Sequence, residues 1–298
     1  MWSKLQIFGF QALWSPYFLL YIIALGLIYH VLTGPLRHKF GAKDEEVPSG
    51  KQKAMFYAGL ILLYIVKGAP VDLLSHILLM AHMIQMALYY LVFPILMIKG
   101  IPAWIWRKVF GVKVLGFILN ILTKPLVAIL LFNFIFSIYH IPFILDFSKS
   151  YQLAHSSITI IILFTAFCMW WPLLSPLGGH QIAKPFGKIL YIFGNGMLIT
   201  PACALIIFSG EPIYATYSDI QAWTNAMSLC VPTDVLNGIS LGGPQVITKI
   251  SILYDQQAGG IIMKVMQEII YGTVLAKVFF KWFKNESSRG IDPIPNQS

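Results

Sequence analysis

Long apolar runs separated by short polar stretches make up most of this sequence. Each run approaches the ~20 residues that an α-helix needs to cross the hydrocarbon core of a bilayer. The pattern predicts an all-α, polytopic transmembrane helix bundle of about seven spans, forming one domain over residues 1–284. The expected spans are residues 17–33, 54–66, 74–97, 115–139, 154–174, 189–208 and 257–280.

Two of these runs leave the number of crossings open. Residues 54–66 are short and need their flanks to span, and residues 114–122 fit either an interfacial helix or an eighth crossing. The first 15 residues lack the charged start and cleavage site of a removable signal, so the first span is expected to stay as an anchor. We also expect an outer loop over 210–254 and a disordered cytoplasmic tail over 285–298.

Composition agrees with a lipid environment. Hydrophobic residues make up 57% of the chain and charged residues 11%, against ~25% charged residues in soluble domains. The mean hydropathy is +0.73. The net charge of +9 does not indicate nucleic acid binding, because the basic residues gather in alternate loops rather than on one soluble face. The positive-inside rule then places the N-terminus outside and the C-terminus in the cytoplasm.

Four of the seven histidines fall at the expected outer ends of spans, namely His76, His82, His140 and His155. Ionisable groups within a membrane are costly, at ~2.5–3.5 kcal/mol for Arg, Lys or Asp at the centre, so they usually mark function. Neutral histidine near the interface costs less. The alternative is that these are interfacial histidines bonded to backbone or water.

Methionines accompany these histidines along the third expected span. Helical spacing would place Asp72, His76, Met80 and Met83 on one stripe, while His82 and Met86 would form a second pair one turn apart. Thioether and imidazole together suit copper, because soft sulfur selects Cu(I) and imidazole accepts either oxidation state. The alternative is that the methionines fill gaps between helices.

Other polar groups add supporting expectations. The seventh span opens with Asp255-Gln256-Gln257-Ala258-Gly259-Gly260, where adjacent glycines permit close helix approach. Lys264 and Glu268 lie one turn apart, which favours a structural ion pair over a proton relay. The three cysteines, Cys168, Cys203 and Cys230, are isolated and expected to be structural thiols. The absence of GxxxxGK and GxGxxG sequences argues against a nucleotide as partner.

Several segments in a fixed order resemble one known family across most of the chain. They are His82-Met83-Ile84-Gln85-Met86, Phe93-Pro94, Gly100-Ile101-Pro102-Ala103-Trp104, His140-Ile141-Pro142, His155, Trp170-Trp171-Pro172 and the segment from Asp255 to Met263. The chain is similar here to the CtaG-type cytochrome c oxidase assembly factors, which are multi-pass proteins of Gram-positive bacteria. The resemblance implies a membrane protein, not an enzyme, that helps to build a caa-type oxidase and is thought to deliver copper to it.

The chain departs from the family pattern at two positions. The usual HMxQH ends in Met86, and the usual HxxxH after the fourth span reads His155 then Thr159. A site with fewer imidazoles and more thioether is consistent with Cu(I), whereas the hydroxyl of Thr159 is a poor copper ligand.

The function that we expect is copper-dependent oxidase assembly at the outer face of the bacterial cytoplasmic membrane. The partners would be oxidase subunits and the lipid bilayer. We expect Gln85 and Gln256 to orient the imidazoles. The rival functions are a copper permease, a metal-free scaffold for an oxidase subunit and, less favoured, an intramembrane enzyme. The expected copper ligands are His76, His82, Met86, His140 and His155, with Met83 and Asp255 as further ligands or supports.

Overall fold

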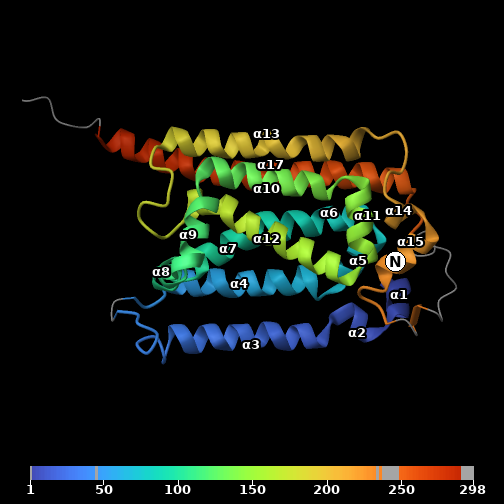
Figure 1. Cartoon of the computed structure of the whole chain (residues 1–298), viewed down its shortest axis with the longest axis horizontal. Helices are drawn as coiled ribbons and strands as arrows, with labels where there is room; N and C mark the ends of the chain where they lie inside the picture. The colour runs from blue at the N-terminus through green and yellow to red at the C-terminus, as the bar shows by residue number, and fades with distance from the viewer. Residues whose placement is uncertain (1, 44–45, 233–234, 237–247, 290–298) are drawn as a thin grey trace, which may run out of the picture.

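The computed structural model describes residues 2–43, 46–232, 235–236 and 248–289. Within these residues every regular element is helical and no strand occurs, so the expected all-α class is confirmed. Long helices run nearly parallel to one another, with short helices closing both ends (Figure 1).

Length and apolar composition identify four to six membrane spans in the described residues. Four are single stretches: residues 2–33, Leu79–Gly100, Gln152–Leu174 and Pro185–Phe208. The other two are helix pairs bent by 41° and 81°, each of which can count as one broken span. The seventh expected span lies in α17 (Ile252–Arg289), which packs along α13 (Pro185–Phe208) and carries more charge than the other spans (Figure 1).

The helix bounds follow the apolar runs with a few breaks. At the N-terminal end are α1 (Trp2–Leu5), η1 (Gln6–Phe8), α2 (Gly9–Trp14), α3 (Pro16–Thr33), α4 (Gly50–Lys67) and α5 (Pro70–Ile77). The middle of the chain forms α6 (Leu79–Met86), the π-helix η2 (Ala87–Val92), α7 (Phe93–Gly100), α8 (Ala103–Gly111), α9 (Lys113–Leu122), α10 (Pro125–Tyr139), α11 (Pro142–Ser150) and α12 (Gln152–Leu174).

The expected third span, 74–97, is interrupted at Leu78. This residue is extended (φ −126°, ψ 130°), so α5 ends at Ile77 and α6 begins at Leu79. The Asp255 carboxylate accepts hydrogen bonds from the amides of Leu79 and Met80, at 2.6 and 3.2 Å, which satisfies donors at the start of α6. The single helical stripe through Asp72, His76, Met80 and Met83 was therefore a wrong prediction.

The expected fourth span, 115–139, also divides. Helices α9 and α10 meet at 81°, so only Pro125–Tyr139 continues along the bundle. Lys124 is extended, as expected before a proline, and Pro125 begins α10 because the first helical position needs no amide donor. This geometry favours the interfacial helix over an eighth crossing for α9.

The expected outer loop contains two short helices, α14 (Ala215–Ser218) and α15 (Ile220–Met227). Asp146 of α11 accepts hydrogen bonds from the amides of Ala215 and Thr216, at 3.0 and 2.9 Å, and from the Thr216 hydroxyl, at 2.7 Å. These contacts fix the loop over one end of the bundle (Figure 1). Residues 233–234 and 237–247 of the loop lie outside the described residues.

The expected tail begins within a helix. Helix α17 continues to Arg289, so the tail expected from residue 285 starts as helix, and its remaining residues, 290–298, lie outside the described residues.

Candidate metal centre

Four histidines lie at the bundle end covered by α11, α14 and α15 (Figure 1). His76 is on α5, His82 on α6, His140 directly after α10, and His155 in the first turns of α12. Their rings form two pairs: the centroids of His76 and His155 are 5.7 Å apart, and those of His82 and His140 are 6.4 Å apart.

Main-chain carbonyls fix the tautomers of His76 and His140. The Nδ1–H of His76 donates to the Asp72 carbonyl at 3.0 Å, and that of His140 donates to the Phe136 carbonyl at 2.7 Å. A carbonyl can only accept, so the proton sits on Nδ1 and the lone pair on Nε2. Both Nε2 atoms are buried and have no hydrogen-bond partner among the described residues.

The other member of each pair also has an unpartnered nitrogen. His82 is fully buried, and its Nε2 lies 3.5 Å from the Tyr139 hydroxyl. In the part of the chain that the structure describes, neither the Nδ1 of His82 nor the buried Nδ1 of His155 has a hydrogen-bond partner. An unsatisfied buried polar group costs ~1–3 kcal/mol, and native proteins retain few of them. Four imidazole nitrogens at one end of the bundle therefore form a polar cluster that lacks partners of its own.

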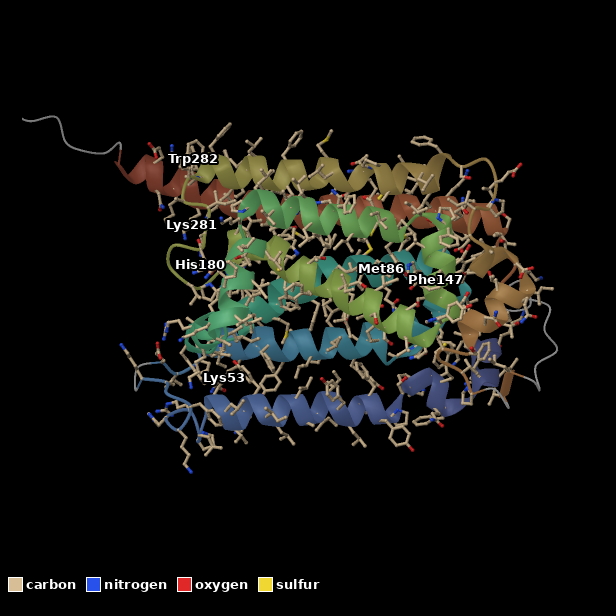
Figure 2. The ribbon with its side chains drawn as sticks, viewed as in Figure 1. Lys53, Met86, Phe147, His180, Lys281 and Trp282 are labelled. Carbon is tan, nitrogen blue, oxygen red and sulfur yellow. The ribbon has the colours of Figure 1, made fainter. Side chains whose placement is uncertain are left out.

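The described residues do not contain three or more histidine, cysteine, aspartate or glutamate side chains grouped to hold a metal. The histidines thus lie as two pairs rather than around one common centre. Met83 and Met86 are buried and belong to the main apolar core of the bundle, and Met86 lies on α6 in the interior of the bundle (Figure 2). Their part in metal binding stays a prediction.

Three polar residues that were expected near the metal form hydrogen bonds that connect helices and loops of the bundle instead. Both oxygens of Asp255 bind the amides at the start of α6. Gln85 donates to the Val66 carbonyl and, at 2.7 Å, to Asp72, while Gln256 binds the Ile213 amide and the Glu211 carbonyl. The expectation that these glutamines orient imidazoles was wrong, because main-chain carbonyls do so for His76 and His140.

A buried lysine, Lys149, stands beside the histidines. Lys149, on α11, is 1% exposed and donates to the Ser75 carbonyl at 3.3 Å. The Tyr217 hydroxyl donates to the same carbonyl at 2.7 Å, which satisfies an acceptor in the last turn of α5. Burial lowers the pKa of Lys149 to about 7. Nothing in its local sequence distinguishes Lys149 from an ordinary surface lysine.

A cavity of about 430 Å³ adjoins the first histidine pair. His76, His155 and Cys230 line it, and the ion pair between Lys67 and Asp72, 2.9 Å apart, also lies in its wall. Cys230 was expected to be an isolated structural thiol. The loop that carries it folds back over α5, a long-range contact that sequence spacing does not reveal.

The expected pair of Lys264 and Glu268 forms within α17, with Nζ and Oε1 2.7 Å apart. Lys264 also donates to the Thr200 hydroxyl of α13 at 3.0 Å. These contacts agree with a structural role for the pair.

Comparison with known protein families identifies the family to which most of the chain is similar. The model of a protein family described as cytochrome c oxidase caa3 assembly factor (Caa3_CtaG) matches residues 27–285, most of the chain. No curated protein and no solved structure matches.

Proposed function

This chain belongs to the cytochrome c oxidase caa3 assembly factor family, and we propose that it binds copper between its paired histidines and passes the metal to the oxidase. The single observation that carries the proposal is the set of four buried imidazole nitrogens that have no hydrogen-bond partner among the described residues. Two of them belong to rings whose other nitrogen donates to a carbonyl, which is the usual way that proteins orient a metal-binding histidine.

The pair geometry supports copper as the cargo. Two imidazoles that share a metal ~2.0–2.1 Å from their nitrogens have ring centroids about 5 to 6 Å apart. The separations of 5.7 and 6.4 Å are near this range. Imidazole accepts both oxidation states of copper, and the thiol of Cys230 and the thioethers of Met83 and Met86 would add soft ligands that favour Cu(I). A pair of imidazoles, rather than a closed cage, suits a metal that must be released.

The proposed side of the membrane follows from charge. Lysines of the loops and of the neighbouring helix ends gather at the end opposite α11. Lys53 of α4 and Lys281 of α17 lie at that end, and Phe147 of α11 lies at the other (Figure 2). With the basic loops in the cytoplasm, the end of the bundle that holds His76, His82, His140 and His155 (the histidine end) faces outward.

A copper-binding measurement on the purified protein tests the proposal. His82→Ala and His140→Ala should each remove the copper held by that pair, roughly half of the copper bound per chain, because the His76 and His155 pair stays intact. His180→Ala is the matched control, because this histidine packs against Phe110 and Trp171 near the opposite end (Figure 2). Equal copper content in all three variants and the unaltered protein would contradict the proposal.

The absence of a three-ligand group in the described residues favours a second candidate, a metal-free scaffold for an oxidase subunit. A deletion strain distinguishes the two. Copper delivery predicts oxidase polypeptides that are present but poorly metallated, with activity restored by added copper. A scaffold predicts a defect that copper does not relieve. Unchanged oxidase activity in low copper would count against both candidates.

A further inference from the structure

A second polar feature lies at the opposite end of the bundle, where four lysines surround two adjoining cavities. One cavity, of about 460 Å³, is lined by Lys99, Lys188, Lys277 and Lys281. The other, of about 430 Å³, shares Lys188 and Lys281. None of the four ammonium groups forms an ion pair with another described residue.

The larger cavity continues from these lysines into the apolar part of the bundle. Val92 and Ile269 line it, seven and eight residues before Lys99 and Lys277 on continuous helical segments. At 1.5 Å per residue the apolar wall therefore reaches ~10–12 Å toward the bilayer centre. The wall is lined mainly by Val, Ile and Leu side chains from four elements, η2, α7, α12 and α17.

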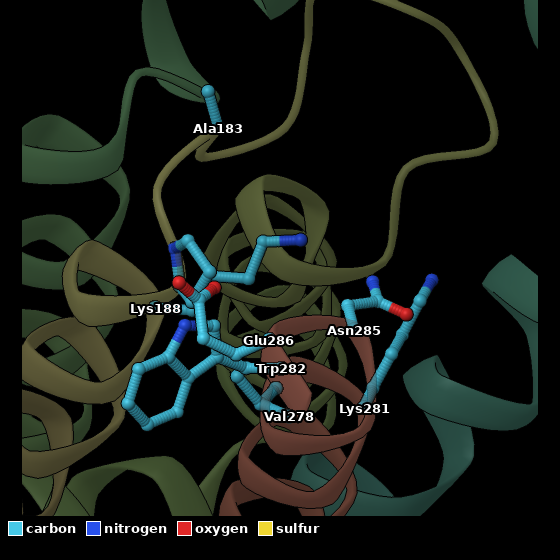
Figure 3. A pocket seen from close by; sticks show the side chains of 8 residues that line it. Ala183, Lys188, Val278, Lys281, Trp282, Asn285 and Glu286 are labelled. Atoms are coloured by element: carbon cyan, nitrogen blue, oxygen red, sulfur yellow. The ribbon is translucent and has the colours of Figure 1, made fainter. Parts of the chain in front are cut away.

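The smaller cavity has the character of a membrane interface. Lys188 and Lys281 lie beside Trp282 and Glu286, with Asn285 completing the rim (Figure 3). Tryptophan prefers the headgroup level of a bilayer. Glu286 is the one carboxylate that lines either cavity, and it is exposed, so the pair of cavities carries an excess of three positive charges from four lysines and one glutamate.

We infer that these two cavities, at the basic end of the bundle, bind an anionic phospholipid of the cytoplasmic leaflet, with its phosphate among the lysines and an acyl chain along the apolar wall. Charge complementarity identifies the occupant. Lys99 is half-buried near the end of a membrane span and forms no ion pair with the residues that the structure describes, and such a charge is costly unless it is paired. Basic pockets between transmembrane helices on the cytoplasmic side are typical binding sites for anionic headgroups.

Native mass spectrometry of the full chain in neutral detergent tests this inference. Added phosphatidylglycerol should bind at lower concentration than phosphatidylcholine, with one lipid per chain at saturation. Lys188→Gln combined with Lys281→Gln should weaken phosphatidylglycerol binding roughly thirtyfold, because each lysine near an anionic surface strengthens binding about fivefold. Replacing both residues by arginine should restore it.

The control removes the same charge from the same end of the molecule without touching the cavities. Lys53→Gln combined with Lys124→Gln should leave phosphatidylglycerol binding unchanged, since both side chains are exposed and neither lines either of the two cavities. Equal loss in both double variants would show diffuse attraction and overturn the site. Equal binding of the two lipids, or competition by inorganic phosphate at the same concentration as lipid, would overturn the assignment to an anionic phospholipid.

Discussion

The chemistry of the histidine end depends on which imidazole nitrogens have no hydrogen-bond partner among the described residues. His76 and His140 use i−4 carbonyls to fix their tautomers, a purely local contact that leaves a lone pair on each ring. Lys149 is close enough to His76, His82 and His155 to act on them electrostatically. A protonated Lys149 opposes a metal cation there, so its charge state couples to copper binding.

Lys149 should also limit stability in a pH-dependent way. Its pKa is about 7 in the fold, lowered first by burial and then by Lys67, while Asp72 and Cys230 act in the opposite direction. In the unfolded chain the pKa of lysine is ~10.4. Between these two pKa values the unfolded chain binds a proton that the folded chain does not, so the free energy of unfolding rises with pH. Below pH 7 Lys149 is protonated in both states, and the destabilisation that it causes no longer changes with pH.

Lys149→Met should therefore raise the unfolding temperature most at pH 7 and less at pH 9. The gain should shrink by ~1.4 kcal/mol per pH unit across this window. Thermal unfolding in detergent at the two pH values measures it. Lys249→Met, which alters an exposed lysine, should change little at either pH. A gain from Lys149→Met that is equal at both pH values would show that the ammonium is not the cause.

At the element scale, close contact between α6 and α17 organises the histidine end. The expected role of the glycine pair is confirmed: a Cβ on Gly259 would lie 3.1 Å from the Met80 amide nitrogen, and one on Gly260 would lie 2.7 Å from the Ile207 side chain. The carboxylate of Asp255, one turn before Gly259, then reaches the amides that start α6.

Gly259→Ala should lower the unfolding temperature, because the neighbouring atoms are main-chain atoms that cannot move aside without separating the helices. Gly272→Ala, in the same helix, has open space around the added methyl and should be neutral or slightly stabilising, by up to ~1 kcal/mol from helix propensity. Thermal unfolding of both variants measures the difference. An equal change in the two would show that helix propensity, and not close approach, sets the effect.

The sequence predicts these elements well where local pattern controls them. Apolar runs located the long helices, and Gly259 with Gly260 predicted a tight crossing. The break at Leu78 could not be predicted, because the run from residue 74 to 97 is continuous and the break is stabilised by Asp255, which lies 176 residues from Leu79. For the same reason the burial of Lys149 and the place of Cys230 beside His76 were not evident.

At the scale of the whole molecule, the two ends of the bundle differ in chemistry. One end carries buried histidines under a lid of short helices, and the other carries lysine-rich loops and cavities (Figures 1 and 2). This asymmetry is what orients a multi-pass protein during insertion, because basic loops stay in the cytoplasm. The histidine end can then meet an oxidase domain outside the membrane only if this orientation holds.

Reporter fusions test the orientation directly. A reporter placed after Arg289 should lie in the cytoplasm, because α17 ends among the basic loops, and one placed within residues 214–248 should lie outside, because α14 and α15 cover the histidine end. Alkaline phosphatase, active outside, and a green fluorescent protein, fluorescent inside, give complementary readouts at each position. Both reporters on one side would show that α17 does not cross the membrane, and an inverted result would place the histidines in the cytoplasm. Either result would end the case for copper delivery from the outer face while leaving membership of the assembly factor family unaffected.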